Sequence, residues 1–284
     1  MSGGCGVGGS EISRITGRTR LFGVLGDPVE QVRAPELLNR EFERLGADAV
    51  LVPVHAPSGR LTEVVRGLQL IGNLDGLLVT VPHKIAVCEL ADHLSPAVVV
   101  SGSANALRRE PDGSWSASNF DGAGFVAGLV HEQRDPAGRT VTVVGAGGAG
   151  SALAVALLEA GVGDLRICDR DPARLADLRA RVEARWPQRA RFSEVPDLLG
   201  ADLAVNATPL GLRETDDLPF DLDDLPPNAV VADIIMTPRD TKLLSLAASR
   251  GHPIHHGIHM LDHQIPAYLD FFGLTDKSDP GGAP

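Results

Sequence analysis

Length, composition and charge restrict what this chain can do. Its 284 residues suffice for two domains with separate cores, and a content of 43% hydrophobic and 22% charged residues is typical of a soluble globular protein. The formal net charge of −11 argues against a nucleic-acid partner, and no apolar run is long enough to span a bilayer, so we expect no membrane association and a cytoplasmic location.

The first half of the chain alternates between strand and helix patterns. A Gly-rich stretch predicts a flexible tail over residues 1–18. The elements expected after it are strands at Leu21–Leu25, Ala49–Val54 and Gly76–Val81, helices at Pro35–Leu45 and Leu61–Leu70, and a hairpin formed by Ala104–Arg109 and Trp115–Ala117. Such alternation predicts a parallel or mixed α/β sheet.

A helix expected over Asp121–Glu132 marks the boundary to a second α/β unit. Its strands are expected at Thr140–Val144, Leu165–Cys168, Leu203–Asn206 and Val230–Ile235, followed by a C-terminal helix over Ile258–Phe272. We therefore expect two domains, one over residues 19–121 together with 258–284, and one over residues 122–257.

A glycine-rich turn opens the second unit. It lies between a β-branched strand and an Ala/Leu-rich helix and consists of Gly145, Ala146, Gly147, Gly148, Ala149 and Gly150. In a Gly-x-Gly-x-x-Gly turn the backbone can approach a pyrophosphate, and the helix N-terminus presents free N–H groups and a positive dipole end. This context predicts a dinucleotide-binding domain of the Rossmann type.

Asp169 follows the next strand, about twenty residues downstream, as this motif requires. A carboxylate there would bind the adenosine ribose and repel a 2′-phosphate, which favours NAD over NADP. Arg170 and Arg174 leave NADP as an alternative, because they could bind a 2′-phosphate if Asp169 turned away; both are equally compatible with solvated charges at a helix start.

In the stretch Val79-Thr80-Val81-Pro82-His83-Lys84, Lys84 lies just past the end of an expected strand, at the edge where α/β sheets collect ligands. Around it and the glycine turn, further segments occur in a fixed order: Gly26-Asp27-Pro28, Ser103-Ala104-Asn105-Ala106-Leu107, Asn119-Phe120-Asp121-Gly122-Ala123-Gly124, Asn206-Ala207-Thr208-Pro209-Leu210-Gly211 and Met260-Leu261-Asp262-His263-Gln264. With these motifs the chain resembles the shikimate dehydrogenase family from about Arg20 to Phe272.

The resemblance implies a substrate-binding first domain and a nicotinamide-cofactor-binding second domain, with a shikimate- or quinate-like cyclic polyol acid as substrate, and thus a link to aromatic amino acid biosynthesis. Lys84 matches the catalytic lysine and Asp121 its partner carboxylate, which suits alcohol oxidation because the hydroxyl proton needs a base. The other implied positions are Thr80, Asn105 and Gln264 for substrate, and Asn206, Thr208, Pro209 and Gly257 for cofactor.

Four departures from the family pattern remove polar groups near the expected substrate. They are Val32-Arg33-Ala34 in place of a Ser-x-Ser pair, Leu78 in place of Asn, Phe120 in place of Thr, and Met236 in place of Tyr. Since sites that hydrogen-bond a substrate reject analogues lacking the partner group, we expect a substrate other than shikimate. Arg33 is either a replacement carboxylate anchor or an exposed arginine.

His259 and His263 are four residues apart on an expected helix, a spacing compatible with metal binding, but the resemblance accounts for this region without metal, so we predict none. A non-catalytic ligand sensor on the same fold is the alternative function, and the presence of an acid/base pair argues for the enzyme. The oligomeric state stays open, with a homodimer as one possibility.

Overall fold

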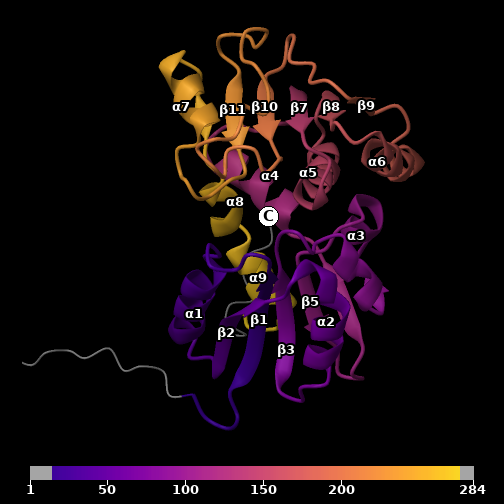
Figure 1. The fold of residues 1–284 in the computed structure, drawn as a ribbon, viewed down its shortest axis with the longest axis vertical. Coiled ribbons are helices and arrows are strands. Elements are labelled where there is room, and N and C mark those ends of the chain that lie inside the picture. Colours follow the sequence, from indigo (N-terminus) through magenta and orange to yellow (C-terminus); the bar gives the residue numbers. More distant parts are fainter. Residues whose placement is uncertain (1–14, 276–284) are drawn as a thin grey trace, which may run out of the picture.

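The computed structural model describes residues 15–275, which form two α/β domains stacked end to end (Figure 1). The prediction for residues 1–18 therefore falls largely outside the described residues. Ile15 to Arg18 are described, and there the Thr19 backbone N–H donates to the Thr16 carbonyl oxygen at 3.2 Å.

The first domain contains a mixed six-stranded sheet in the order β2-β1-β3-β5-β6-β4. Its strands are β1 (Arg20–Gly26), β2 (Ala49–His55), β3 (Leu74–Val79), β4 (His93–Leu94), β5 (Ala106–Arg109) and β6 (Trp115–Ser118). The strands β1, β2 and β3 are parallel, whereas β5 runs antiparallel to both β3 and β6. The carboxyl ends of the three parallel strands therefore meet at one edge, which faces the second domain in Figure 1.

Helices bury both faces of this sheet. Apolar residues of α1 (Ala34–Arg44) and of the C-terminal helix α9 (Ile265–Phe271) pack on one face, against Phe22 and Leu78. The other face is covered by α2 (Leu61–Gln69), the short 3-10 helix η2 (Ala86–Leu90) and α3 (Pro96–Ser101), whereas the residues of the 3-10 helix η1 (Ser58–Arg60) are exposed. The C-terminal segment thus folds back onto the first domain.

The second domain is a wholly parallel sheet in the order β12-β11-β10-β7-β8-β9. Its strands are β7 (Thr140–Val144), β8 (Asp164–Cys168), β9 (Ala190–Ser193), β10 (Leu203–Asn206), β11 (Val230–Asp233) and β12 (Ile254–His255), and its helices are α5 (Gly148–Glu159), α6 (Pro172–Arg185) and α7 (Lys242–Ser249). The strand order reverses between β7 and β10, which is the doubly wound Rossmann arrangement. The predicted fold class is confirmed.

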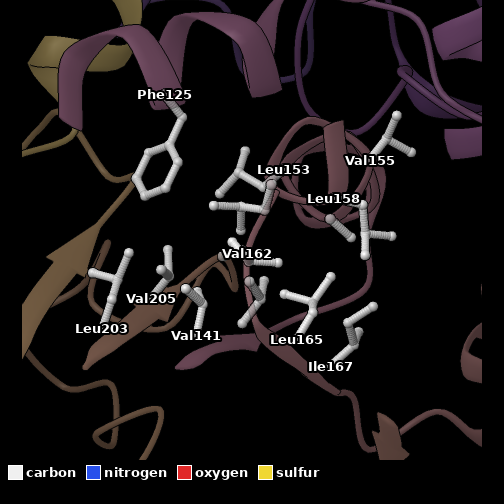
Figure 2. Packing of buried hydrophobic residues seen from close by; sticks show 14 of the residues in the cluster. Phe125, Val141, Leu153, Val155, Leu158, Val162, Leu165, Ile167, Leu203 and Val205 are labelled. Carbon is white, nitrogen blue, oxygen red and sulfur yellow. The ribbon is translucent and has the colours of Figure 1, made fainter. Parts of the chain in front are cut away.

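The second domain has a core cluster on each face of this sheet, one against α5 and one against α7. Figure 2 shows Leu153 and Leu158 of α5 above Val141, Leu165 and Ile167 of the strands. These five side chains are at most 5% exposed. Such continuous apolar strands are expected of a parallel sheet that is covered on both faces.

Two helices, α4 (Asp121–His131) and α8 (Ile258–Asp262), lie side by side where the domains join (Figure 1). Their backbones approach closely, since a Cβ built on Gly124 would lie 2.5 Å from the Met260 carbonyl oxygen. Phe125 and Leu129 of α4 belong to the core of the second domain. The chain therefore passes between the domains within α4, whose first residue is Asp121.

The single C-terminal helix expected over Ile258–Phe272 is wrong. The structure has two helices, α8 and α9, separated by His263 and Gln264. Pro266 lies in the first turn of α9, where its missing N–H is tolerated; inside one continuous helix it would lose a backbone hydrogen bond and its ring would clash with the carbonyl of the preceding turn. The break turns Gln264 toward the first domain.

None of the helices within residues 15–275 has the length and apolar character that crossing a membrane requires.

Candidate active site

Lys84 and Asp121 form an enclosed ion pair at the carboxyl edge of the first sheet. Lys84 lies in the turn after β3, and its Nζ is 2.6 Å from Oδ2 of Asp121. The side chains are only 13% and 3% exposed. The Lys84 carbonyl oxygen accepts a hydrogen bond from the Ala104 N–H at 2.7 Å, which ties the turn to the chain leading into β5. The predicted catalytic lysine and its partner carboxylate are thus adjacent.

Two amides occupy the other oxygen of Asp121. Asn105 Nδ2 donates to Oδ1 at 2.9 Å, and Gln264 Nε2 donates to the same oxygen at 3.3 Å. Both amide residues are at most 2% exposed. The carboxylate therefore presents one oxygen to Lys84 and has the other held by N–H donors, which restricts its rotation.

A second chain of hydrogen bonds connects Asp121 to the glycine turn of the other domain. The Asp121 N–H donates to Asn119 Oδ1 at 3.0 Å, and Asn119 Nδ2 donates to Ser103 Oγ at 2.9 Å. The Ser103 hydroxyl donates to the carbonyl oxygen of Gly148 at 2.6 Å. A Cβ on Gly148 would lie 2.8 Å from Cβ of Lys84. The ion pair therefore lies against the N-terminus of α5.

The positions that depart from the family pattern form one apolar group beside the pair. They belong to a single hydrophobic cluster: Val32, Ala34, Leu78, Phe120 and Met236. Met236 reaches this cluster from the second domain, after β11, and the Phe120 ring packs edge-on against Tyr268 with centroids 5.4 Å apart. Chain segments that are distant in sequence thus contribute to a single apolar surface, here called the apolar wall.

Arg33 and Thr80 flank this group. Arg33 is the N-cap residue of α1, is half-buried, and forms no ion pair within the described residues. Thr80 follows β3, and its backbone N–H donates to the Leu25 carbonyl oxygen at 2.8 Å. Both residues lie at the carboxyl edge of the first sheet, at the N-terminus of α1 and the end of β3.

The glycine turn has the geometry that a pyrophosphate requires. Gly145 has φ +109°, and a Cβ on Gly150 would lie 1.8 Å from the Gly145 carbonyl oxygen, so these two positions of the turn require glycine. Gly147 is the N-cap of α5; it makes no side-chain cap, and nothing lies within 4 Å of its Cβ position. The space beside Gly147 is therefore open, and the first N–H groups of α5, which have no intrahelical acceptor, fit an anionic group there.

Asp169 is buried and its carboxylate is turned inward. Oδ2 accepts from the Ala146 N–H at 2.8 Å, and Oδ1 accepts from the Asp171 N–H at 2.9 Å. Arg174 Nη1 lies 3.3 Å from Oδ2, with a side chain 45% exposed, and Arg170 is exposed. The carboxylate thus supports the glycine turn, and the arginines provide the accessible charge beside it.

A second loop borders the glycine turn across the point where the strand order reverses. Asn206 Oδ1 accepts from both the N–H and the hydroxyl of Thr208, at 3.0 and 2.7 Å, and Pro209 follows. Asn206 Nδ2 donates to the buried Asp233 at 3.2 Å, and Thr241 Oγ1 donates to it at 2.8 Å. Burial raises the pKa of Asp233 to about 6. The buried carboxyl links the loops after β10 and β11.

Gly257 lies at the N-terminus of α8, where a Cβ would lie 2.5 Å from the Ile234 carbonyl oxygen. Gly257 is therefore packed against the backbone between β11 and Met236.

The histidines near α8 are packed against one another. His255 is 1% exposed, neither ring nitrogen has a hydrogen-bond partner within residues 15–275, and burial lowers its pKa to about 3. Its ring centroid is 4.9 Å from that of His259, and His263 Nδ1 lies 2.8 Å from the His259 carbonyl oxygen. Among the described residues, no group of three or more His, Cys, Asp or Glu is arranged to hold a metal ion.

Sequence patterns indicate the pair and its amides but not all of their partners. Ser103 and Asn119 stand within the motifs without an assigned role, and Asp233 and Tyr268 carry no motif signal of their own. Tyr268 follows Gln264 by four residues, a spacing at which helical side chains meet, and this is the signal that could have found it.

Known proteins resemble this chain over most of its length. A family model described as the shikimate dehydrogenase substrate binding domain matches residues 24–107, and a ThiF family model matches residues 130–185. A shikimate dehydrogenase (NADP(+)) of Rubrobacter xylanophilus is 40% identical over 257 residues, covering 89% of this chain and 90% of the relative. The chain belongs to the shikimate dehydrogenase family.

Solved structures agree with this membership. A shikimate dehydrogenase crystallised in complex with NADP+ has a TM-score of 0.83 and 27% identity, with 94% of each chain covered. A ligand-free 5-ketofructose reductase of Gluconobacter sp. strain CHM43 has a TM-score of 0.77 and 26% identity, covering 90% of this chain and 94% of that one. This member of the shikimate dehydrogenase family is thus an oxidoreductase acting on a CH–OH group.

Proposed function

We propose that this protein transfers a hydride between a nicotinamide cofactor and the secondary alcohol of a shikimate- or quinate-like polyol, with Lys84 and Asp121 as the acid/base pair. The observation that carries the proposal is the ion pair of 2.6 Å enclosed against the N-terminus of α5. A non-catalytic sensor would have no use for a buried proton-transfer pair at that place.

The roles of the two side chains follow from their contacts. As the neutral amine, Lys84 Nζ accepts the proton of the substrate hydroxyl during oxidation, and the ammonium so formed donates that proton back to the carbonyl oxygen during reduction. Asp121, held by Asn105 and Gln264, orients the lysine and balances its charge. When bound, the nicotinamide ring supplies the hydride acceptor or donor. The Thr80 hydroxyl and the second N–H of the Gln264 amide offer hydrogen bonds to a polyol.

We further propose that the substrate is less polar, or contacts the protein through fewer groups, than shikimate. The support is the apolar cluster of Val32, Leu78, Phe120 and Met236, which stands where hydrogen-bonding groups are expected. One structurally similar reductase is named for 5-ketofructose, so this fold also accommodates a substrate other than shikimate. Arg33 is the candidate carboxylate anchor if the substrate is an acid.

For the cofactor, we propose that NADP is accepted beside NAD, with Arg170 and Arg174 as ligands of the 2′-phosphate. The inward carboxylate of Asp169 supports this, because its oxygens are already engaged and Arg174 offsets its charge. The NADP(+) dependence in the name of the Rubrobacter relative points the same way.

Kinetics on a substrate panel test the proposed function. With shikimate, quinate, aminoshikimate, other cyclitols and 5-ketofructose against both cofactors, we expect turnover of one compound and kcat/KM for shikimate below about 10⁴ M⁻¹s⁻¹. The variant Val32→Ser/Ala34→Ser should raise the shikimate value at least about tenfold, because two hydroxyls are restored where the family holds a carboxylate.

The matched control is Val64→Ser/Ala91→Ser, which makes the same exchanges at half-buried positions on the other face of the first sheet and should leave kcat/KM unchanged. A wild-type value for shikimate above about 10⁴ M⁻¹s⁻¹ contradicts the altered-substrate proposal. Cofactor binding without turnover of any substrate would favour a sensor instead.

Replacing Arg170 and Arg174 with serine should raise KM for NADP+ by about tenfold or more, since each charge-assisted bond to phosphate is lost and Asp169 loses its neighbouring cation. KM for NAD+ should stay within about twofold of the wild-type value. The control is Arg179→Ser on the same helix, whose guanidinium pairs with Glu183. Equal losses with both cofactors would remove the arginines from this role.

A further inference from the structure

The single tyrosine of the chain, Tyr268, contacts the two amides that hold the carboxylate of the acid/base pair. Tyr268 is on α9 and is 4% exposed. Its hydroxyl donates to Gln264 Oε1 at 2.5 Å and accepts from Asn105 Nδ2 at 2.9 Å. It therefore contacts both amides that hold Asp121, and within residues 15–275 its hydroxyl hydrogen bonds go to these amides and not to Asp121 itself.

The hydrogen bonds determine which way each amide points. Asn105 Oδ1 accepts from the Phe120 N–H at 2.9 Å, so Nδ2 is left to face Asp121 and Tyr268. For Gln264, the donor to Oε1 is the Tyr268 hydroxyl, which leaves Nε2 to face Asp121. If the side-chain amide of Gln264 rotated by 180°, its carbonyl oxygen would face the Asp121 carboxylate, an unfavourable contact between two acceptors.

The Tyr268 hydroxyl also remains a neutral hydrogen-bond donor at neutral pH. Burial raises its pKa well above the usual value of 10, and the charge of Asp121 adds to this effect. The hydroxyl hydrogen thus stays available for Gln264. Because that glutamine is 2% exposed, its carbonyl oxygen has no access to bulk water that could replace the tyrosine.

We propose that Tyr268 is a positioning residue for the reaction: its hydroxyl orients the amide of Gln264 so that its N–H joins that of Asn105 in holding Asp121 Oδ1 and leaves Oδ2 directed at Lys84. Its catalytic consequence rests on the proposed function of the pair, whereas the orientation of the amides can be measured without turnover. The Tyr268 ring further supports Phe120 of the apolar wall through edge-on packing.

The first experiment measures the amides directly in the full chain. In ¹H–¹⁵N spectra, the side-chain signals of Asn105 and Gln264 are assigned by comparison with Asn105→Ala and Gln264→Ala proteins. In Tyr268→Phe, which removes one oxygen and keeps the ring, the Gln264 side-chain protons should exchange with solvent at least about tenfold faster, because the fixed orientation is lost. Exchange within about twofold of wild type overturns the proposal whether or not a substrate is known.

The second experiment measures the consequence for catalysis. Tyr268→Phe should lower kcat by about tenfold to a hundredfold while KM for the cofactor stays unchanged, since a small displacement of the acid/base pair acts on the chemical step. In a Gln264→Ala background the same exchange should have much less effect on kcat, because the tyrosine acts through that amide. Full additivity of the two losses would indicate a structural role only and overturn the proposal.

The matched control is Thr142→Val, which removes a buried hydroxyl that donates to the Asp197 carbonyl oxygen at 2.6 Å in the second domain. It should lower the midpoint of thermal unfolding without changing kcat. If the wild-type protein turned over no substrate, the proposed function would fail, and the amide exchange would still decide the orientation by Tyr268.

Discussion

Replacing Lys84 with alanine should lower kcat by about 10³-fold and leave cofactor affinity unchanged, because the group that exchanges the substrate proton is lost while the glycine turn is intact. The backbone at Lys84 should persist, since its carbonyl oxygen is held by the Ala104 N–H. Steady-state kinetics and titration of reduced cofactor by fluorescence measure the two effects separately. A residual kcat within about tenfold of wild type would exclude Lys84 as the proton-transfer group.

The Lys84→Ala protein leaves the charge of Asp121 buried without its partner, which can cost about 3–5 kcal/mol of stability. A second variant, Lys84→Met/Asp121→Asn, removes both charges, and the amide introduced by the second exchange retains an oxygen for the Asn105 and Gln264 donors. The double variant should fold, and its kcat should be as low as that of Lys84→Ala. Small primary amines added to Lys84→Ala should restore part of the activity. The control Lys242→Ala changes an exposed lysine at the start of α7 and should keep full kcat.

Replacing Gly150 with alanine should disrupt the glycine turn and with it cofactor binding. The added Cβ would lie 1.8 Å from the Gly145 carbonyl oxygen, a backbone atom that cannot move aside alone. We expect a loss of about 3 kcal/mol or more in unfolding free energy, as for a severe overpacked contact, and cofactor affinity at least about a hundredfold weaker. Thermal unfolding and fluorescence titration with reduced cofactor measure both.

Gly147→Ala is the matched variant at an earlier position of the same turn. Nothing lies within 4 Å of its Cβ position, so the fold and its melting temperature should be unchanged. The methyl group would instead occupy open space at the start of α5 and raise KM for the cofactor by about tenfold. Unchanged affinity in Gly147→Ala would mean that the pyrophosphate does not bind at this helix N-terminus.

Some parts of the molecule are encoded by residues that are adjacent in sequence. The strand Thr140–Val144, the glycine turn and the helix after it are all predictable, because their signal lies in residues that are adjacent in sequence. Lys84 and Asp121 can be named only through the ordered family motifs, since a lysine after a proline turn is ordinarily a solvated charge.

Other features need the folded chain. The direction of the Asp169 carboxylate depends on the Ala146 N–H, which is 23 positions away, so its sequence position alone favours the ribose contact. The substitutions at Val32, Phe120 and Met236 read as separate losses of polar groups, whereas in the structure they belong to one cluster across two domains. Whether they face the substrate stays a prediction.

Local patterns are sufficient for the two α/β units, the dinucleotide turn and the family, because strand and helix periodicity, tight turns and motif order depend on short stretches of chain. How the acid/base pair is held depends instead on long-range contacts. Asn105 and Gln264 reach Asp121 from 16 and 143 positions away, and Tyr268 reaches Asn105 from 163. Such contacts arise when the C-terminal helix folds back on the first sheet, and no local pattern specifies them.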